Sequence, residues 1–264
     1  MRIPFTKAHG AKNDFLLTWL ARAPERDQPA VARAICDRHT GVGADGWILV
    51  TPPVDTTADG AIDLYNSDGS AAEISGNGTR CAAAFLIRHG YASGTVRVLT
   101  GAGLKTLRVL RHSELVYEFE MNMGRPQIQA GRFDLELADG LRDVTLLSVG
   151  NPQCVAPVAD FDFDWRRMGA EIECHPHFPN RTNVSFLRAV DEHTIDVRFF
   201  ERGAGETMSS GTGSTGAAVA AVLRGMAKSP VRVLTPAGPI DLRIADEAFL
   251  TGPAEIVAEG EFLL

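Results

Sequence analysis

Val96-Arg97-Val98-Leu99-Thr100 occurs again, letter for letter, as Val231-Arg232-Val233-Leu234-Thr235. The offset from 96 to 231 is 135 residues, and the match continues upstream without a gap. There, Ser75-Gly76-Asn77-Gly78 aligns with Ser210-Gly211-Thr212-Gly213. A self-match at one fixed offset is typical of an internal duplication. The sequence therefore predicts two related structural units in one chain.

Each copy predicts the same series of elements. A short β-prone run, 62–65 or 197–200, leads into the glycine-rich turn, and an alanine-rich segment of helical spacing follows. The helices are predicted over 76–89 and 211–224, because a glycine stands directly after each as a stop signal. Since alanine allows close backbone approach, we expect each helix to lie buried inside a sheet.

Further elements are predicted outside the duplicated core. An amphipathic pattern predicts a helix over 28–38, and residues 118–130 are predicted to cross between the lobes. We expect the lobes to span 1–122 and 123–264, with the C-terminal tail packing back onto the first. Runs rich in branched and aromatic residues predict strands at 46–50, 105–110, 115–121, 144–149, 183–187, 194–197 and 240–244.

The composition is that of a globular protein. The 264 residues are 45% hydrophobic and 22% charged, which excludes a disordered or fibrous chain. The formal net charge is -7 at pH 7, and the sequence contains no basic run. Because nucleic-acid binding needs clustered basic side chains, we expect no nucleic-acid partner.

The cysteine pattern and the hydropathy favour a soluble, cytoplasmic protein. Neither a signal-peptide h-region nor an apolar stretch near the ~20 residues of a membrane span is present in the sequence. We therefore expect no membrane partner. The cysteines stand far apart, without a Cys-x-x-Cys pair, and are expected to be reduced thiols: Cys36, Cys81, Cys154 and Cys174.

Two glycine motifs and one histidine pair raise the question of a cofactor. Segments 41–46 and 211–216 both fit Gly-x-Gly-x-x-Gly, the pattern of a dinucleotide site, which needs a strand before it, a helix after it and a later acidic residue. The first segment is followed by a strand-like run instead of a helix, and the second has no acidic residue at the required distance. His175-Pro176-His177 is the only close histidine spacing, and it is not typical of a metal site. We expect neither a metal nor a cofactor.

The Ser-Gly-x-Gly turns stand where each predicted helix begins. Exposed N–H groups at a helix N-terminus, with a dipole equivalent to roughly +0.5 charge, bind anions. Equivalent loops of two pseudo-symmetric lobes often meet in the cleft between them, so we expect both turns to face one carboxylate. The simpler interpretation is that Ser75 and Ser210 are only helix caps. Two copies in register favour a site.

Several motifs together resemble those of the diaminopimelate epimerases, over nearly the whole chain. The resemblance implies an α+β fold of two pseudo-symmetric lobes, each a mostly antiparallel sheet or barrel around a central helix. It also implies a cofactor-independent isomerase in which one residue from each lobe approaches the α-carbon. The motifs lie at residues 7–15, 37–38, 41–46, 66–70, 76–81, 150–152, 179–183 and 201–207.

The family's two catalytic residues are cysteines, and serine stands at both positions here. A thiol has a pKa near ~8.5 that a helix N-terminus can lower, whereas a serine hydroxyl is a far weaker acid. Gln153 stands where the family has a histidine, and Glu201 is retained. The resemblance thus implies Ser75, Ser210, Glu201 and Gln153 as the catalytic positions.

The resemblance also implies how the substrate is held. Backbone N–H groups at the two helix N-termini would bind the α-carboxylate, and Arg202 would pair with the distal carboxylate. By spacing alone, Glu201 and Arg202 could equally form a structural ion pair. The remaining substrate-binding positions are Asn13, Asn66, Gly76, Asn77, Asn151, Asn183, Glu201, Gly211 and Thr212.

We therefore expect an epimerase that interconverts LL-2,6-diaminopimelate and meso-diaminopimelate in lysine and peptidoglycan precursor biosynthesis. Its partner would be a small amino-acid substrate, and a homodimer is left open. Loss of both thiols keeps other functions in view. These are another amino-acid racemase, a hydroxy-amino-acid dehydratase on the same scaffold, and an amino-acid-binding protein without turnover.

Overall fold

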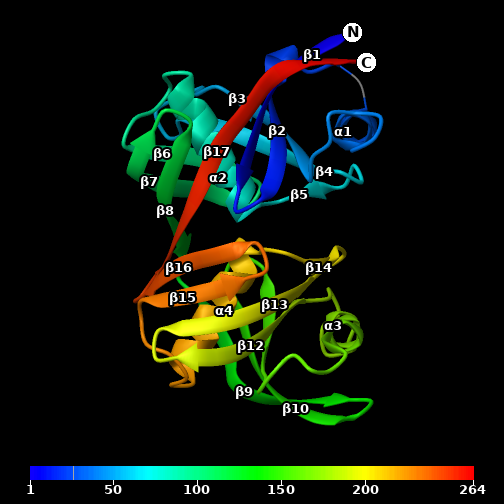
Figure 1. The fold of residues 1–264 in the computed structure, drawn as a ribbon, viewed down its shortest axis with the longest axis vertical. Helices are drawn as coiled ribbons and strands as arrows, with labels where there is room; N and C mark the ends of the chain where they lie inside the picture. The colour runs from blue at the N-terminus through cyan, green and yellow to red at the C-terminus, as the bar shows by residue number, and fades with distance from the viewer. Residues whose placement is uncertain (26) are drawn as a thin grey trace. The chain divides into compact units, whose positions relative to one another are not determined.

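The computed structural model describes residues 1–25 and 27–264 and divides the chain into two compact units. Unit 1 comprises Met1–Met121 and Gly252–Leu264, and unit 2 comprises Asn122–Thr251. In each, β-strands enclose one central helix, α2 (Gly76–Arg88) in unit 1 and α4 (Gly211–Leu223) in unit 2 (Figure 1). The expected α+β architecture is confirmed. The lobe limits 1–122 and 123–264 stay a prediction.

Unit 1 carries both ends of the chain. The N-terminal strand β1 pairs antiparallel with the C-terminal strand β17, as Figure 1 shows in blue and red. Its other elements in chain order are β1 (Arg2–Gly10), β2 (Asn13–Trp19), η1 (Leu20–Arg22), α1 (Gln28–Cys36), β3 (Gly46–Thr51), β4 (Gly60–Asn66), β5 (Ala71–Ala72), β6 (Thr95–Thr100), β7 (Gly103–Ser113), β8 (Val116–Gly124) and β17 (Ala248–Leu263), of which β8 and β17 run on into unit 2.

Unit 2 repeats this order of elements. A short helix, α3, again precedes the strand that leads to the duplicated segment. The elements are β9 (Gln127–Leu137), β10 (Gly140–Ser148), β11 (Pro152–Pro157), α3 (Trp165–Glu173), β12 (Asn183–Asp191), β13 (Thr194–Glu201), β14 (Gly205–Thr207), β15 (Val231–Thr235) and β16 (Gly238–Ile244).

The duplication read from the sequence is also a duplication of strand register. In unit 1, β4 pairs parallel with β6, with Gly60 opposite Val98. In unit 2, β13 pairs parallel with β15, with Ile195 opposite Val233, which is the same pair 135 residues later. Most other pairs in both units are antiparallel.

The central helices are buried, and most of their side chains are small. Helix α2 buries every residue from Gly76 to Leu86, and α4 buries every residue from Gly211 to Ala221. Each helix ends one residue before its predicted end, followed by a cap residue and a glycine with positive φ. Surrounding strands can approach such helices closely, and this fixes where the helix N-termini lie.

Several strands and two short helices were not predicted. The strand β17 contains Gly252, Pro253 and Gly260, which argue against a strand in sequence terms. Pro253 has no N–H to donate, but its carbonyl accepts a hydrogen bond from Arg80. The other elements missed were β1, β2, η1, β5, β9, β11, α3 and β14, while every predicted strand has a counterpart in the structure.

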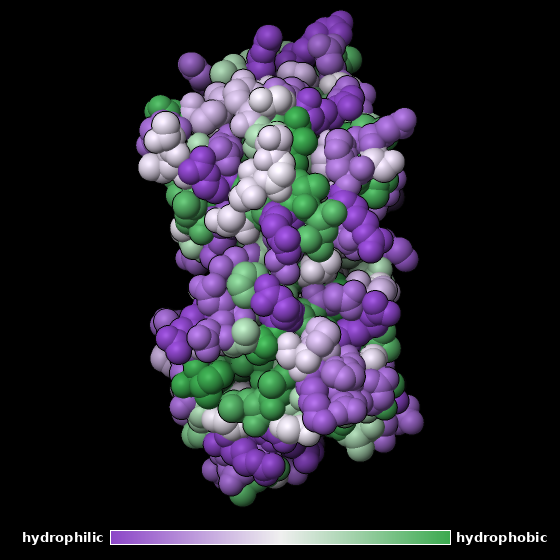
Figure 2. All heavy atoms as spheres, turned by 90° about the vertical axis from the view of Figure 1, so that its left-hand side faces the viewer, coloured by the Kyte–Doolittle hydropathy of each residue, from purple (hydrophilic) through white to green (hydrophobic). Residues whose placement is uncertain are grey.

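The surface is mixed in character. Figure 2 shows areas of apolar side chains interrupted by polar ones, as on most globular proteins. Among residues 1–25 and 27–264, no helix is long and apolar enough to cross a membrane. All four cysteines are free thiols, and Cys174 alone is exposed.

Candidate functional site

The N-terminus of α2 is capped by Ser75. Its Oγ accepts a hydrogen bond from the N–H of Gly78 at 3.1 Å, and its carbonyl accepts one from Thr79 Oγ1 at 2.7 Å. The N–H groups of Gly76 and Asn77 have no hydrogen-bond partner in the described part of the chain. Two free donors at a helix N-terminus can bind an anion.

The N-terminus of α4 has the same construction. Ser210 Oγ accepts from the N–H of Gly213 at 3.0 Å, and the N–H groups of Gly211 and Thr212 bind none of the described residues. Ser210 is buried. The structure therefore forms both predicted caps, and in each unit it leaves the donors that the sequence assigned to a carboxylate free.

Glu201 lies beside Ser210 at the end of β13. Burial raises the pKa of the Glu201 carboxyl, and the nearby hydroxyls of Ser210 and Thr207 oppose the shift without cancelling it. The Thr207 hydroxyl is buried and lies outside hydrogen-bond geometry with every described residue. A partly buried carboxyl with a raised pKa next to a hydroxyl is suited to proton transfer near neutral pH.

Gln153 and Asn151, at the start of β11, lie near the N-terminus of α4. Gln153 Nε2 donates to Asn151 Oδ1 at 2.8 Å, and Asn151 Nδ2 donates to Thr212 Oγ1 at 3.3 Å. Gln153 is 2% exposed, yet its Oε1 has no partner among residues 1–25 and 27–264. A buried, unpaired acceptor is costly unless a ligand or water completes it.

Asn183 connects the neighbouring loops. Its Nδ2 donates to the carbonyl of Pro152 at 2.9 Å, and its Oδ1 accepts from the N–H of Arg202 at 3.1 Å. The Arg202 side chain is exposed and makes one long hydrogen bond, to the carbonyl of Asn180 at 3.4 Å. No ion pair between described residues joins Glu201 to Arg202, so the structural ion pair considered above does not form.

Glu173 anchors the loops that carry these residues. The carboxylate accepts from the N–H of Gly203 at 3.0 Å, from Cys174 Sγ at 2.8 Å and from Arg181 at 3.2 Å. Burial alone would raise the pKa of Glu173, but these hydrogen bonds outweigh it and hold the pKa below its ordinary value. Sequence reasoning missed Glu173, because nothing in the spacing relates α3 to residue 203.

In unit 1 the three predicted asparagine side chains lie in two separate hydrogen-bonded groups. Asn77 Nδ2 donates to Asn13 Oδ1 at 3.2 Å, and Asn13 Nδ2 donates to Asp45 Oδ2 at 2.6 Å. Asn66 does not join them: its Nδ2 donates to Ser70 Oγ at 2.9 Å in an exposed turn. Asn66 aligns with Glu201, so the acid of unit 2 has no carboxylate counterpart in unit 1.

The buried thiols are unsuited to replace the thiols implied by the resemblance. Burial raises the pKa of Cys81, on α2, to about 12, and it does the same for Cys154 and Cys36. Such thiols stay protonated near neutral pH. None of these three thiols is therefore available as a thiolate base.

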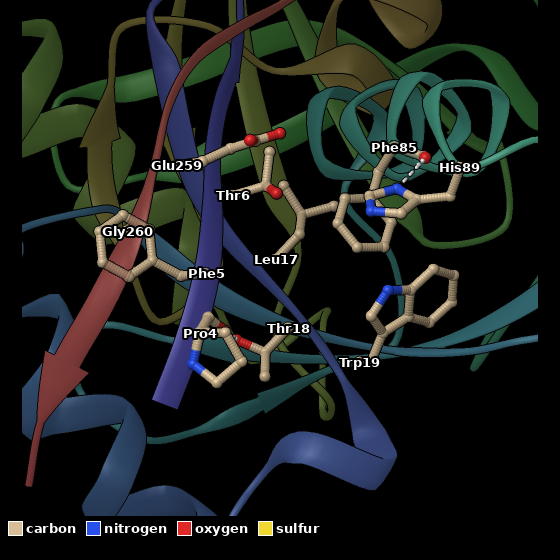
Figure 3. A pocket seen from close by; sticks show the side chains of 10 residues that line it. All are labelled: Pro4, Phe5, Thr6, Leu17, Thr18, Trp19, Phe85, His89, Glu259 and Gly260. Atoms are coloured by element: carbon tan, nitrogen blue, oxygen red, sulfur yellow. Dashed lines mark hydrogen bonds between the residues drawn. The ribbon is translucent and has the colours of Figure 1, made fainter. Parts of the chain in front are cut away.

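One pocket of unit 1 involves none of the predicted site residues. It encloses about 220 Å³ and is lined by ten residues, among them the rings of Trp19, Phe85 and His89 (Figure 3). His89 Nδ1 lies 2.8 Å from the carbonyl of Phe85, so this histidine closes the end of α2. Elsewhere in the described residues, no group of three acidic, histidine or cysteine side chains could hold a metal ion.

Comparison with known proteins gives one family. The family model described as Diaminopimelate epimerase matches residues 5–129 and 145–257. The diaminopimelate epimerase of Azoarcus sp. (strain BH72) is 41% identical over 280 residues, covering 100% of both chains. That of Pelotomaculum thermopropionicum is 38% identical over 276 residues, covering 98% of each.

Solved structures of related fold include more distant proteins. A phenazine biosynthesis protein of the PhzF family from Bacillus anthracis has a TM-score of 0.76 at 15% identity, over 100% of both chains. A hydroxyproline epimerase from Agrobacterium vitis has a TM-score of 0.73 at 16% identity, over 98% of this chain and 90% of that one. At these identities the likeness establishes the fold alone.

Proposed function

The chain belongs to the diaminopimelate epimerase family, and on this premise we propose that it interconverts LL-2,6-diaminopimelate and meso-diaminopimelate. The reaction removes the proton from one α-carbon and returns it to the opposite face. Full-length relatives at 34% to 41% identity support this substrate and the isomerase class. The reaction supplies lysine and peptidoglycan precursor biosynthesis. We assign the protein to the cytoplasm, and a homodimer stays open.

The observation that carries the proposal is the pair of Glu201 and Ser210 at the N-terminus of α4. Serine alone is too weak an acid to furnish a base. The Glu201 carboxylate can take the Ser210 hydroxyl proton while Ser210 Oγ takes the α-proton, so that a neutral carboxyl, an intact serine and a carbanion result. General base catalysis of this kind contributes about 10²–10⁴-fold.

The two helix N-termini stabilise the charge that develops. As the α-proton leaves, negative charge moves onto the α-carboxylate, and the free N–H groups of Gly76, Asn77, Gly211 and Thr212 are the proposed donors to it. That both N-termini face one substrate is part of the proposal. Ser75 is the proposed proton donor on the second face of the α-carbon. Its hydroxyl proton passes to the carbanion, and solvent water returns a proton to the resulting Ser75 alkoxide.

The distal end of the substrate carries a second carboxylate. Arg202 has no acidic partner within residues 1–25 and 27–264, and its guanidinium makes only one long hydrogen bond there, to the Asn180 carbonyl, so it is available for a bidentate contact. Asn151, Asn183 and Gln153 lie in one hydrogen-bonded cluster of the same unit and are the proposed contacts to the substrate's polar groups, together with Asn13 of unit 1.

Chiral chromatography tests the proposal. Purified protein incubated with LL-diaminopimelate should accumulate the meso isomer, and Arg202→Met should raise KM. Arg132→Met, which removes an exposed arginine paired with Asp143, is the matched control and should behave as the parent protein. Binding without any meso product would instead indicate an amino-acid-binding protein, and turnover of other amino acids another racemase.

A further inference from the structure

Arg80 is a buried cation of unit 1 that the proposed reaction does not use. Its side chain is 0% exposed on α2. Nε donates to the carbonyl of Pro253 at 3.0 Å, Nη1 donates to that of Gly76 at 3.3 Å, and Nη2 donates to Asn77 Oδ1. None of its partners in the described residues is a carboxylate. Because Arg80 is buried without an acidic partner, its pKa is lowered to about 10, and burying its charge costs free energy of folding.

Two glycines make room for this guanidinium. A Cβ on Gly252, in β17, would lie 2.8 Å from Arg80 Cζ, and a Cβ on Gly10, in β1, would lie 3.2 Å from Nη2. Real Cβ atoms do not approach as closely as the first of these distances. Two strands of unit 1 therefore lack side chains at the positions where the guanidinium lies.

The duplication answers whether the fold itself needs a cation there. Position 80 aligns with Thr215, which is also buried and donates to the carbonyl of Gly211 at 2.8 Å. Helix α4 has the same length and the same serine cap as α2. A threonine is thus sufficient to build this helix N-terminus, and the guanidinium has a role specific to unit 1.

That role follows from the direction of the hydrogen bonds. A guanidinium can only donate, so Asn77 must turn its Oδ1 toward Arg80 and its Nδ2 toward Asn13. Asn13 then turns its Nδ2 toward Asp45, whose carboxylate can only accept. Both amides are held in one orientation from both ends.

We propose that Arg80 is a positioning residue that fixes the Asn77 and Asn13 amides for recognition of the substrate's α-amino and α-carboxylate groups. Asn77 and Asn13 each use one of their two side-chain N–H donors in the hydrogen bonds that link Arg80 to Asp45, and the second donor stays available. Asn13 Oδ1 keeps one lone pair, which suits an ammonium donor. The identity of the ligand rests on the proposed function, whereas the fixed orientation does not.

The test combines spectroscopy of the ligand-free protein with ligand binding. In Arg80→Met, the side-chain ¹H–¹⁵N signals of Asn77 and Asn13 should shift, and the Kd for LL-diaminopimelate should rise about tenfold, as for loss of a hydrogen bond to a charged group. Arg80→Lys should recover part of both, since an ammonium also only donates. Arg88→Met, on the same helix and paired with Glu259 at the surface, should change neither.

The two readouts separate this proposal from the proposed function. Unshifted amide signals in folded Arg80→Met would overturn it, as would shifted signals with an unchanged Kd for a ligand that the parent binds. If the parent binds no diaminopimelate, the proposed function fails while the amide signals still decide the role of Arg80. If Arg80→Met does not fold, Asp45→Asn replaces the carboxylate at the other end of the same series of hydrogen bonds. Unshifted Asn13 and Asn77 side-chain signals in Asp45→Asn would then overturn the proposal.

Discussion

At the scale of single residues, the proposed proton transfer depends on one carboxyl. Glu201 is partly buried, has a raised pKa and faces the hydroxyl of Ser210, whereas the aligned position in unit 1 is Asn66. The two units therefore share a helix N-terminus but not this carboxyl. This asymmetry gives predictions for Glu201 and for the two serines.

Glu201→Gln should lower kcat by about 10²–10⁴-fold, because the general base is lost while the shape is kept. In the parent protein, the acid limb of kcat/KM should lie above the ordinary glutamate range, since Glu201 must ionise. The raised pKa also predicts folding stability that is present at low pH and lost as pH rises through that pKa. Urea unfolding across pH should show that Glu201→Gln lacks this loss. An acid limb at the ordinary glutamate pKa would contradict the assignment.

Replacing both serines by cysteine should raise epimerase activity. The double variant Ser75→Cys with Ser210→Cys sets thiols at two helix N-termini, where their pKa is lowered and a thiolate base becomes available. Initial rates of meso formation measure the gain, and Ser209→Cys, next to the cap, is the control. No gain, even with Gln153→His added, would mean that the positions of these side chains differ from those of the family.

Which residues could be predicted depended on where their signal lies. Ser75, Ser210, Glu201 and Gln153 stand in local motifs, so a resemblance found them. Arg80 stands in such a motif too, but its burial depends on Gly252, 172 positions further along, and no spacing relates the two. The one signal in the sequence is that the aligned positions of the two copies differ, with arginine at 80 and threonine at 215.

At the scale of elements, the duplicated helices were the predictable part. Alanine content, a serine cap and a terminal glycine are local signals, and α2 and α4 follow them to within one residue. The strand β17 was not predictable, because its glycines make room for neighbouring side chains, Arg80 and Phe5, instead of forming turns. Helix α3 is only nine residues long, and its role lies in the loops it holds.

Glu173→Gln should loosen the loops that α3 holds. Because its folded pKa is lowered, Glu173 contributes stability that is present above the ordinary glutamate pKa and lost as pH falls through the folded pKa. Urea unfolding near neutral pH should give a loss of about 2 kcal/mol, which shrinks in acid, and KM should rise because residues 183 and 202 lose their support. Glu171→Gln, on the same helix, is the control. A loss that is independent of pH would contradict this role.

At the scale of the whole molecule, unit 1 is closed by both ends of the chain. Arg2 lies opposite Leu263 in the β1–β17 pair, and the Met1 ammonium donates to the carbonyl of Leu264 at 2.6 Å. Composition alone predicted a globular body, and the repeat predicted two units. Neither could reveal that β17 also supplies the carbonyl of Pro253 to Arg80.

Deleting residues 252–264 should therefore unfold unit 1 before unit 2. The deletion removes one of the two strands that pair with β1 and leaves the Arg80 cation without one of its acceptors, while unit 2 keeps its own strand pairs. Hydrogen exchange followed by mass spectrometry should show early exchange in peptides of 1–121 and protection in peptides of 127–244. Equal protection in both units would contradict this dependence.

The central claim is that the pair of Glu201 and Ser210 moves the α-proton of diaminopimelate. The most direct measurement is the ¹H NMR spectrum of LL-diaminopimelate incubated with the protein in D₂O. The α-proton signal should be lost as the meso isomer forms with the parent protein, and it should persist with folded Glu201→Gln. A parent protein that binds LL-diaminopimelate and leaves its α-protons unexchanged would contradict the claim.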